Sequence, residues 1–153
     1  RTAIAVCLRN EPMEPILAAL APLLAGLPAE RFSLWFLSDT DDPAHRAAED
    51  AALAEWRATQ PTPIHLRRRA TNTGFKAGNV MDFLDHHAEG FELFLALDAD
   101  SEMSAAAVLM SAKATSARRK ALPRSASVFG SFTPCGPSAM LPNSILRPRL
   151  FTS

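Results

Sequence analysis

The chain has 153 residues, of which 48% are apolar and 21% charged, which is typical of one globular domain large enough to bury a core. Its two cysteines exclude a disulfide framework and a cysteine-based zinc site, and Cys7 is expected to be a small buried residue. The net charge of zero hides an asymmetry, because residues 1–102 hold all 16 acids and sum to −7, whereas residues 103–153 sum to +7.

Strands and helices are expected to alternate through the first 120 residues. Short apolar, β-prone runs predict strands at 2–8, 31–37, 64–68 and 91–97. Ala- and Leu-rich segments predict helices at 13–27 (bent or interrupted near Pro22), 44–59, 78–88 and 104–119. This alternation predicts βαβ units and a mostly parallel α/β sheet flanked by helices.

The most informative stretch is the run 91–97, which leads directly into Asp98-Ala99-Asp100. Its continuous apolar character predicts a strand that is buried on both faces. Ligands of open α/β sheets bind beyond the carboxyl ends of the strands. Two carboxylates at such an end suit Mg²⁺, which takes one or two protein carboxylates together with phosphate oxygens. The alternative is that these acids simply end a strand and precede a helix.

Polar residues also follow the other predicted strands. Asn10-Glu11 follows the first, Ser38-Asp39 the second, and a basic loop containing Lys76 the third. Because the carboxyl ends of parallel strands share one edge of the sheet, this pattern is typical of a nucleotide site.

Four motifs resemble, in their order along the chain, those of family-2 glycosyltransferases of the GT-A type. They are Asn10-Glu11, LSDTDDP at 37–43, Lys76-Ala77-Gly78-Asn79 and LDADSEM at 97–103. Within that family the phrases look most like the glucan biosynthesis glucosyltransferase H proteins, inner-membrane enzymes that build the osmoregulated periplasmic glucan backbone from UDP-glucose. The resemblance covers residues 2–103. It implies a GT-A (Rossmann-like) sheet in the order 3-2-1-4, with 1–120 as the nucleotide-sugar-binding half.

The resemblance also implies roles for seven residues. Glu11 and Asp39 would face the uridine, Lys76 the diphosphate and Asp98 the donor sugar or ribose; Gly78 would let the backbone approach the nucleotide, Asn79 would hydrogen-bond it, and Asp100, with Asp98, would hold Mg²⁺ or Mn²⁺. The residue types alone leave simpler roles open: a helix N-terminal acid, a turn cap, a solvated lysine and a plain helix start.

The arginine cluster and the histidines are not expected to form a binding site of their own. Arg67, Arg68 and Arg69 could extend the positive surface toward the diphosphate, but a solvated strand end is favoured, and the acidic surroundings argue against nucleic-acid binding. His65 and the pair His86-His87 lack metal-ligand spacing.

Several family features are missing from this sequence. No general base in a Thr-Glu-Asp motif, no Gln-x-x-Arg-Trp motif and no membrane-spanning helix occurs, and no acid follows Glu102. The start at Arg1 predicts a fragment or a processed chain, and the lack of acids after Glu102 predicts that it is without its catalytic base. We expect this fragment to be soluble and its parent to lie at the cytoplasmic face of the bacterial inner membrane. The Pro-, Ser- and Arg-rich tail 121–153 is interpreted as disordered, out of frame or a folded extension.

The expected function of the parent is metal-assisted, inverting transfer of glucose from UDP-glucose to a growing β-glucan acceptor. A cellulose synthase-like or other β-glycan synthase would use the same motifs. A catalytically inactive nucleotide-binding fragment is a further alternative. A nucleotidyltransferase is disfavoured, because no Gly-rich signature follows the first strand.

Overall fold

A computed structural model describes residues 1–121, with side chains up to residue 115. Strands are β1 (Thr2–Leu8), β2 (Phe32–Ser38), β3 (Ile64–Arg68) and β4 (Leu93–Asp98). Helices are α1 (Met13–Ala25), α2 (Pro43–Arg57), α3 (Phe75–His86) and α4 (Ala105–Ala121), with a short 3₁₀ turn at Ala29–Arg31. The proposed tail, apart from Ala121, lies outside these residues.

The four strands form one parallel sheet in the order β3-β2-β1-β4, which confirms the expected topology. In the register of the ladders Leu8 pairs with Ser38, Ser38 with Arg68, and Cys7 with Asp98. The carboxyl ends of all four strands therefore meet at one edge, and the polar residues that follow them come together there.

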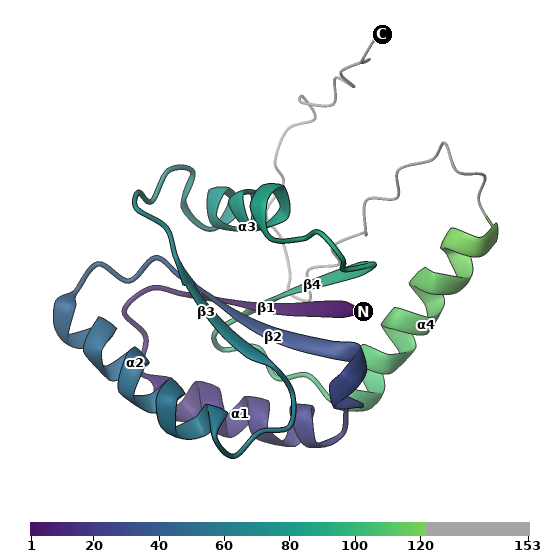
Figure 1. Cartoon of the computed structure of the whole chain (residues 1–153), viewed down its shortest axis with the longest axis horizontal. Helices are drawn as coiled ribbons and strands as arrows, with labels where there is room; N and C mark the ends of the chain where they lie inside the picture. The colour runs from purple at the N-terminus through teal and green to yellow at the C-terminus, as the bar shows by residue number, and fades with distance from the viewer. Residues whose placement is uncertain (122–153) are drawn as a thin grey trace, which may run out of the picture.

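Helices cover both faces of the sheet (Figure 1). Helices α1, α2 and α4 lie on one face, where Leu24, Leu53 and Val108 join the larger apolar cluster. Helix α3 covers the other face, where Phe83 packs with Ala3 of the central strand. The core thus sits between α1, α2 and β1–β2, and it fixes the strand ends from both sides.

Three local expectations need correction. Helix α1 continues through Pro22 without interruption. Proline has no N–H to donate to the carbonyl one turn earlier, but Pro22 is exposed, so water can bond that carbonyl instead. Helix α3 begins at Phe75 rather than at Gly78, so Lys76 lies in its first turn. Strand β4 is only half-buried, apart from Leu97, because it pairs with β1 alone and forms the edge of the described sheet.

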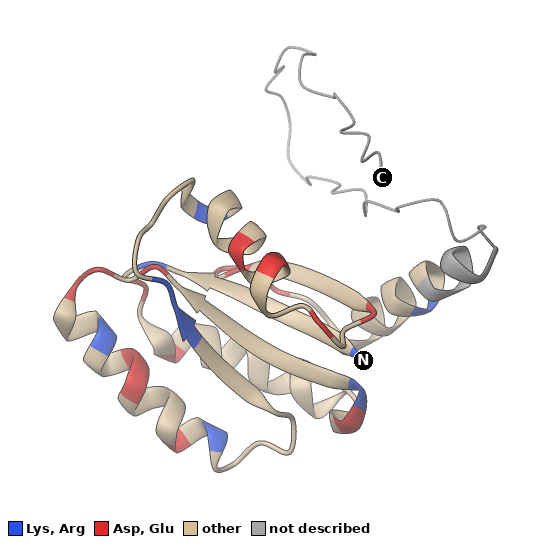
Figure 2. Ribbon diagram, turned by 45° about the horizontal axis from the view of Figure 1, so that its top comes forward, with Lys and Arg blue, Asp and Glu red and all other residues tan. Residues whose placement is uncertain are grey.

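Charged residues gather on the outer side of α2, at the end of β3 and in the loops beyond the strand ends, while the central strands carry almost none (Figure 2). Within residues 1–121 no helix combines the length and apolar character needed to cross a bilayer.

Candidate functional site

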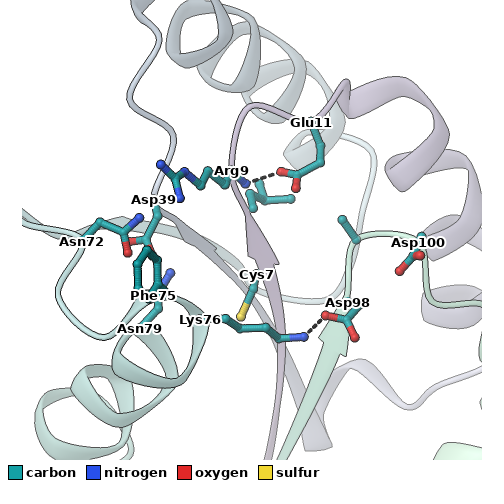
Figure 3. A pocket seen from close by; sticks show the side chains of 12 residues that line it. Cys7, Arg9, Glu11, Asp39, Asn72, Phe75, Lys76, Asn79, Asp98 and Asp100 are labelled. Carbon is teal, nitrogen blue, oxygen red and sulfur yellow. Dashed lines mark hydrogen bonds and ion pairs between the residues drawn. The ribbon is translucent and has the colours of Figure 1, made fainter. Parts of the chain in front are cut away.

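A pocket of about 620 Å³ opens at the carboxyl edge of the sheet, where β1, β2, β4 and the start of α3 converge (Figure 3). It is lined by Cys7, Leu8, Arg9, Glu11, Asp39, Asn72, Phe75, Lys76, Asn79, Asp98, Ala99 and Asp100. Six of the seven residues singled out in the sequence line it. The exception is Gly78, and the specific roles of all seven stay predictions.

The Asp98-Ala99-Asp100 segment forms a tight turn at the end of β4. The backbone N–H of Asp98 donates to Ser101 Oγ at 3.0 Å, and the backbone N–H of Ser101 donates to the Asp98 carbonyl at 3.0 Å. Within the described part of the chain the Asp100 carboxylate has no hydrogen-bond or ion-pair partner. One carboxylate of the pair is thus free to accept a ligand.

Lys76 reaches across the pocket and forms an ion pair with Asp98 (Figure 3). Both side chains are about half exposed, at 46% and 51%. An exposed pair of this kind contributes little to stability. It can therefore separate at low cost when an anion approaches Lys76 or a cation approaches Asp98.

Asp39 lies just beyond β2 and is held in a bidentate pair with Arg69. Arg69 Nε donates to Asp39 Oδ1 at 2.6 Å, and Nη2 donates to Oδ2 at 2.8 Å. Both residues are partly buried, with 9% of the Arg69 side chain and 5% of the Asp39 side chain exposed. Hydrogen bonding to Asp39 raises the pKa of the Arg69 guanidinium above its ordinary value. The carboxylate is fixed at the pocket wall with lone pairs still available to a ligand.

Arg69 also organises the loop that leads into α3. Its guanidinium donates to the carbonyl of Thr73 at 2.7 Å, to Asn72 Oδ1 at 2.7 Å and to the carbonyl of Phe75 at 2.8 Å. One side chain therefore ties Asp39 to Asn72 in the loop and to Phe75 at the start of α3, and these three groups form one wall of the pocket.

Gly78 and Asn79 lie on the side of α3 that packs against the protein. A Cβ at Gly78 would overlap the carbonyl oxygen of Thr73, so the glycine is what allows the loop to lie against the helix. Asn79 is buried, with Nδ2 donating to the Leu37 carbonyl at 2.9 Å and Oδ1 accepting from Arg67. Both residues hold α3 in position beside the pocket.

Glu11 lies at the rim after β1, where its carboxylate accepts the backbone N–H of Arg9. The preceding residue, Asn10, has a left-handed backbone with a φ of 61°. Its side chain donates to Asp41 Oδ1 at 2.7 Å and accepts from the backbone N–H of Asp42 at 3.3 Å. The loops after β1 and β2 are thus joined above the pocket.

Cys7 lies on the pocket floor at the end of β1 and is a free thiol. Burial raises the pKa of the Cys7 thiol, and the positive charge of Lys76 offsets this only in part. The thiol therefore stays protonated near neutral pH and is a poor nucleophile.

The interpretation of Arg67–Arg69 as a solvated strand end is wrong. Arg67 is buried and contacts Asp82 at 2.7 Å, and burial lowers the pKa of its guanidinium. Arg68 pairs with the buried Glu49 at 2.8 Å. The acids that pair with Arg67 and Arg68 lie on helices α3 and α2, and the partner of Arg69 follows β2, so the sequence of the strand itself does not indicate them.

The residues that sequence reasoning missed are Arg69 as a positioning group, and Asn72, Phe75, Arg9 and Cys7 as pocket lining. Arg9 and Phe75 directly precede the motif residues Asn10 and Lys76, which is a local signal, whereas Asn72 and Cys7 carried none.

Few side chains near the pocket could ligate a metal ion. The described residues contain no group of three or more His, Cys, Asp or Glu side chains able to hold an ion. Asp98 and Asp100 do offer the one or two carboxylates that Mg²⁺ takes when a nucleotide supplies phosphate oxygens. The donor set fits a metal–diphosphate complex better than a metal ion by itself.

No family model matches the chain. It is similar to glucans biosynthesis glucosyltransferase H of Caulobacter vibrioides, with 36% identity over 118 residues, covering 74% of this chain and 18% of that protein. The protein of the same name from Vibrio cholerae is 35% identical over 111 residues, covering 67% of this chain and 15% of the relative. The chain therefore spans less than a fifth of the length of these relatives.

Among solved structures, the chain is similar to Staphylococcus aureus TarS 1-349, with a TM-score of 0.57, 18% identity, and coverage of 78% of this chain and 33% of that one. A second structure of TarS 1-349, in complex with UDP-GlcNAc, has a TM-score of 0.55 and 19% identity, covering 78% and 32%. The likeness confirms the GT-A fold expected from the sequence.

Proposed function

We infer that this chain, a homologue of part of the glucans biosynthesis glucosyltransferase H proteins, provides the donor-binding site of a glycosyltransferase. The proposed donor is UDP-glucose, bound together with Mg²⁺ or Mn²⁺. The proposed reaction of the whole protein is inverting transfer of glucose to a growing β-glucan.

One observation carries this proposal. Six residues that the sequence motifs predict to bind the donor come from four separate places in the chain and line one pocket at the carboxyl edge of a parallel sheet. A nucleotide is the ligand class expected at that edge. A UDP-sugar as the donor is supported by the UDP-GlcNAc complex of a protein with the same fold.

The two ends of the pocket suit the two ends of a nucleotide (Figure 3). Lys76, Asp98 and Asp100 lie together at one end, where a cation and two carboxylates match a metal-bound diphosphate. Asp39 and Asn72 lie at the other end and offer the acceptor and donor atoms that a uracil edge requires.

In this arrangement Asp98 and Asp100 would hold the metal. When bound, the ion supplies Lewis-acid stabilisation of the departing UDP. Lys76 would exchange Asp98 for the diphosphate and add a second positive charge beside it. Asp39, kept in place by Arg69, would orient the uridine.

An inverting transfer also requires a general base for the acceptor hydroxyl. No acid follows Glu102 in this sequence. We propose that the base and the acceptor site of the whole protein lie in regions that correspond to the unmatched parts of the relatives. The same observation favours a second candidate function, a nucleotide-binding unit without transfer activity.

The test is calorimetric titration of UDP into the 153-residue chain with and without Mn²⁺, repeated with Asp100→Asn. We expect binding that requires Mn²⁺ and falls at least tenfold in the variant, because the free carboxylate at the end of β4 is lost. Glu102→Gln, which removes the same charge two residues further along at an exposed position, is the matched control and should bind as the native chain does.

Equal loss in Asp100→Asn and Glu102→Gln would mean that general charge, and not a metal ligand, governs binding. Failure of the folded native chain to bind UDP at all would refute the proposed donor site.

A further inference from the structure

Phe75 is an exposed aromatic residue at the rim of the pocket. Its side chain is 71% exposed, although a phenyl ring is ordinarily buried. No ring contact involves Phe75 among the residues that the structure describes. Packing within the described chain therefore does not account for its position.

The backbone at this position is also unusual. Phe75 has a φ of 51° and follows Gly74, whose φ is 72°, so two successive residues are left-handed. A bulky side chain rarely adopts this conformation, and such outliers gather at ligand sites. The Arg69 guanidinium holds the conformation by bonding the Phe75 carbonyl at 2.8 Å. The loop thus presents a phenyl ring to the pocket in a fixed place.

The neighbours of the ring suggest what it meets. Asn72 uses Oδ1 to accept from Arg69 at 2.7 Å, and its Nδ2 donor has no partner in the part of the chain that the structure describes. Asp39 supplies acceptor atoms beside it (Figure 3). A flat apolar ring next to one donor and one acceptor complements the face and edge of a nucleobase.

We propose that Phe75 is the stacking platform for the base of the bound nucleotide, with the Asn72 amide donating to a base carbonyl. This inference rests on the proposed function, because it needs a nucleotide in the pocket. It assigns base recognition to the loop before α3 and to Phe75, the first residue of that helix. This region is separate from the metal–diphosphate end at Lys76 and Asp98. Stacking contributes to affinity for any base. Donation from the Asn72 amide to the 4-carbonyl of the base favours uracil over cytosine, which carries an amino group at that position.

The test compares two probes on the 153-residue chain in the presence of Mn²⁺: UDP, which has a base, and inorganic pyrophosphate, which has none. Phe75→Ala and Phe75→Leu should weaken UDP binding about tenfold to a hundredfold, the range expected for loss of one base stack. Phe75→Tyr keeps an aromatic face and should bind UDP within about threefold of the native chain. Pyrophosphate binding should be unchanged in all three variants.

The exposure of Phe75 means that these variants should fold, and thermal unfolding should give a Tm no lower than that of the native chain. Unchanged UDP binding in Phe75→Ala would overturn the inference while leaving the donor site intact. Equal losses of UDP and pyrophosphate binding would also overturn it, because the ring would then be acting on loop structure. Absence of UDP binding in the native chain would refute the proposed function and this inference with it.

Discussion

Asp39 and Arg69 illustrate how a side chain that looks like a ligand-binding acid can also be part of the structural frame. Their bidentate contacts of 2.6 and 2.8 Å join the end of β2 to the loop before α3. Arg69 further bonds two backbone carbonyls in that loop, so its removal would free several groups at once. The guanidinium therefore fixes the pocket wall.

Arg69→Gln is expected to lower the free energy of unfolding by about 3 kcal/mol, because it leaves the Asp39 carboxylate, whose side chain is only 5% exposed, without its cation. Urea unfolding followed by circular dichroism would measure the change. Arg9→Gln, which breaks the exposed 3.5 Å pair with Asp41, is the matched control and should cost no more than about 0.5 kcal/mol.

If Arg69→Gln cost as little as Arg9→Gln, the buried pair would have no structural role. Addition of Asp39→Asn to Arg69→Gln should recover part of the loss, because the unpaired charge is then gone.

At the scale of elements, helix α3 and its preceding loop form one unit. The loop folds back so that the Thr73 carbonyl lies against the helix at Gly78, and Asn79 fastens the helix to the end of β2 through the Leu37 carbonyl. Phe75, Lys76 and Asn72 reach the pocket from this unit. Its position therefore controls one whole side of the site.

Gly78→Ala tests this packing. Helix propensity by itself would favour alanine by about 1 kcal/mol, but the added methyl group would overlap the Thr73 carbonyl oxygen and displace the loop. We expect a net loss of stability of about 1–3 kcal/mol in urea unfolding, together with weaker UDP binding.

Gly90→Ala provides the comparison, since its Cβ would meet open space and would bear only the strain of a φ of 85°, at a cost of about 1 kcal/mol. UDP binding should be unaffected there. A gain in stability for Gly78→Ala would contradict the close approach of loop and helix.

At the scale of the whole molecule, the described chain presents a sheet covered on both faces with one polar edge. All 16 acids lie within residues 1–102, the part of the sequence that forms this edge. Compared with relatives of which it covers less than a fifth, the chain holds the residues proposed for the donor and none proposed for the acceptor.

We therefore expect the 153-residue chain to bind UDP-glucose without transferring glucose to a β-glucan acceptor. Release of UDP, followed by a coupled assay, should not exceed that of Asp100→Asn under the same conditions. Mn²⁺-dependent transfer that disappears in Asp100→Asn would contradict this expectation and would require a base among the acids before Met103.

The sequence by itself determined the alternation of strands and helices, since apolar runs such as Thr2–Leu8 are local patterns that need no partner to be recognised. Its motifs also marked six of the residues that line the pocket and implied the sheet order. The tertiary structure decided the Arg69–Asp39 pair, 30 residues apart, the contact of Gly78 with Thr73 and the exposure of Phe75. Such contacts depend on which side chains the folded sheet and helices bring together, and a one-dimensional pattern of polar and apolar residues does not encode that proximity.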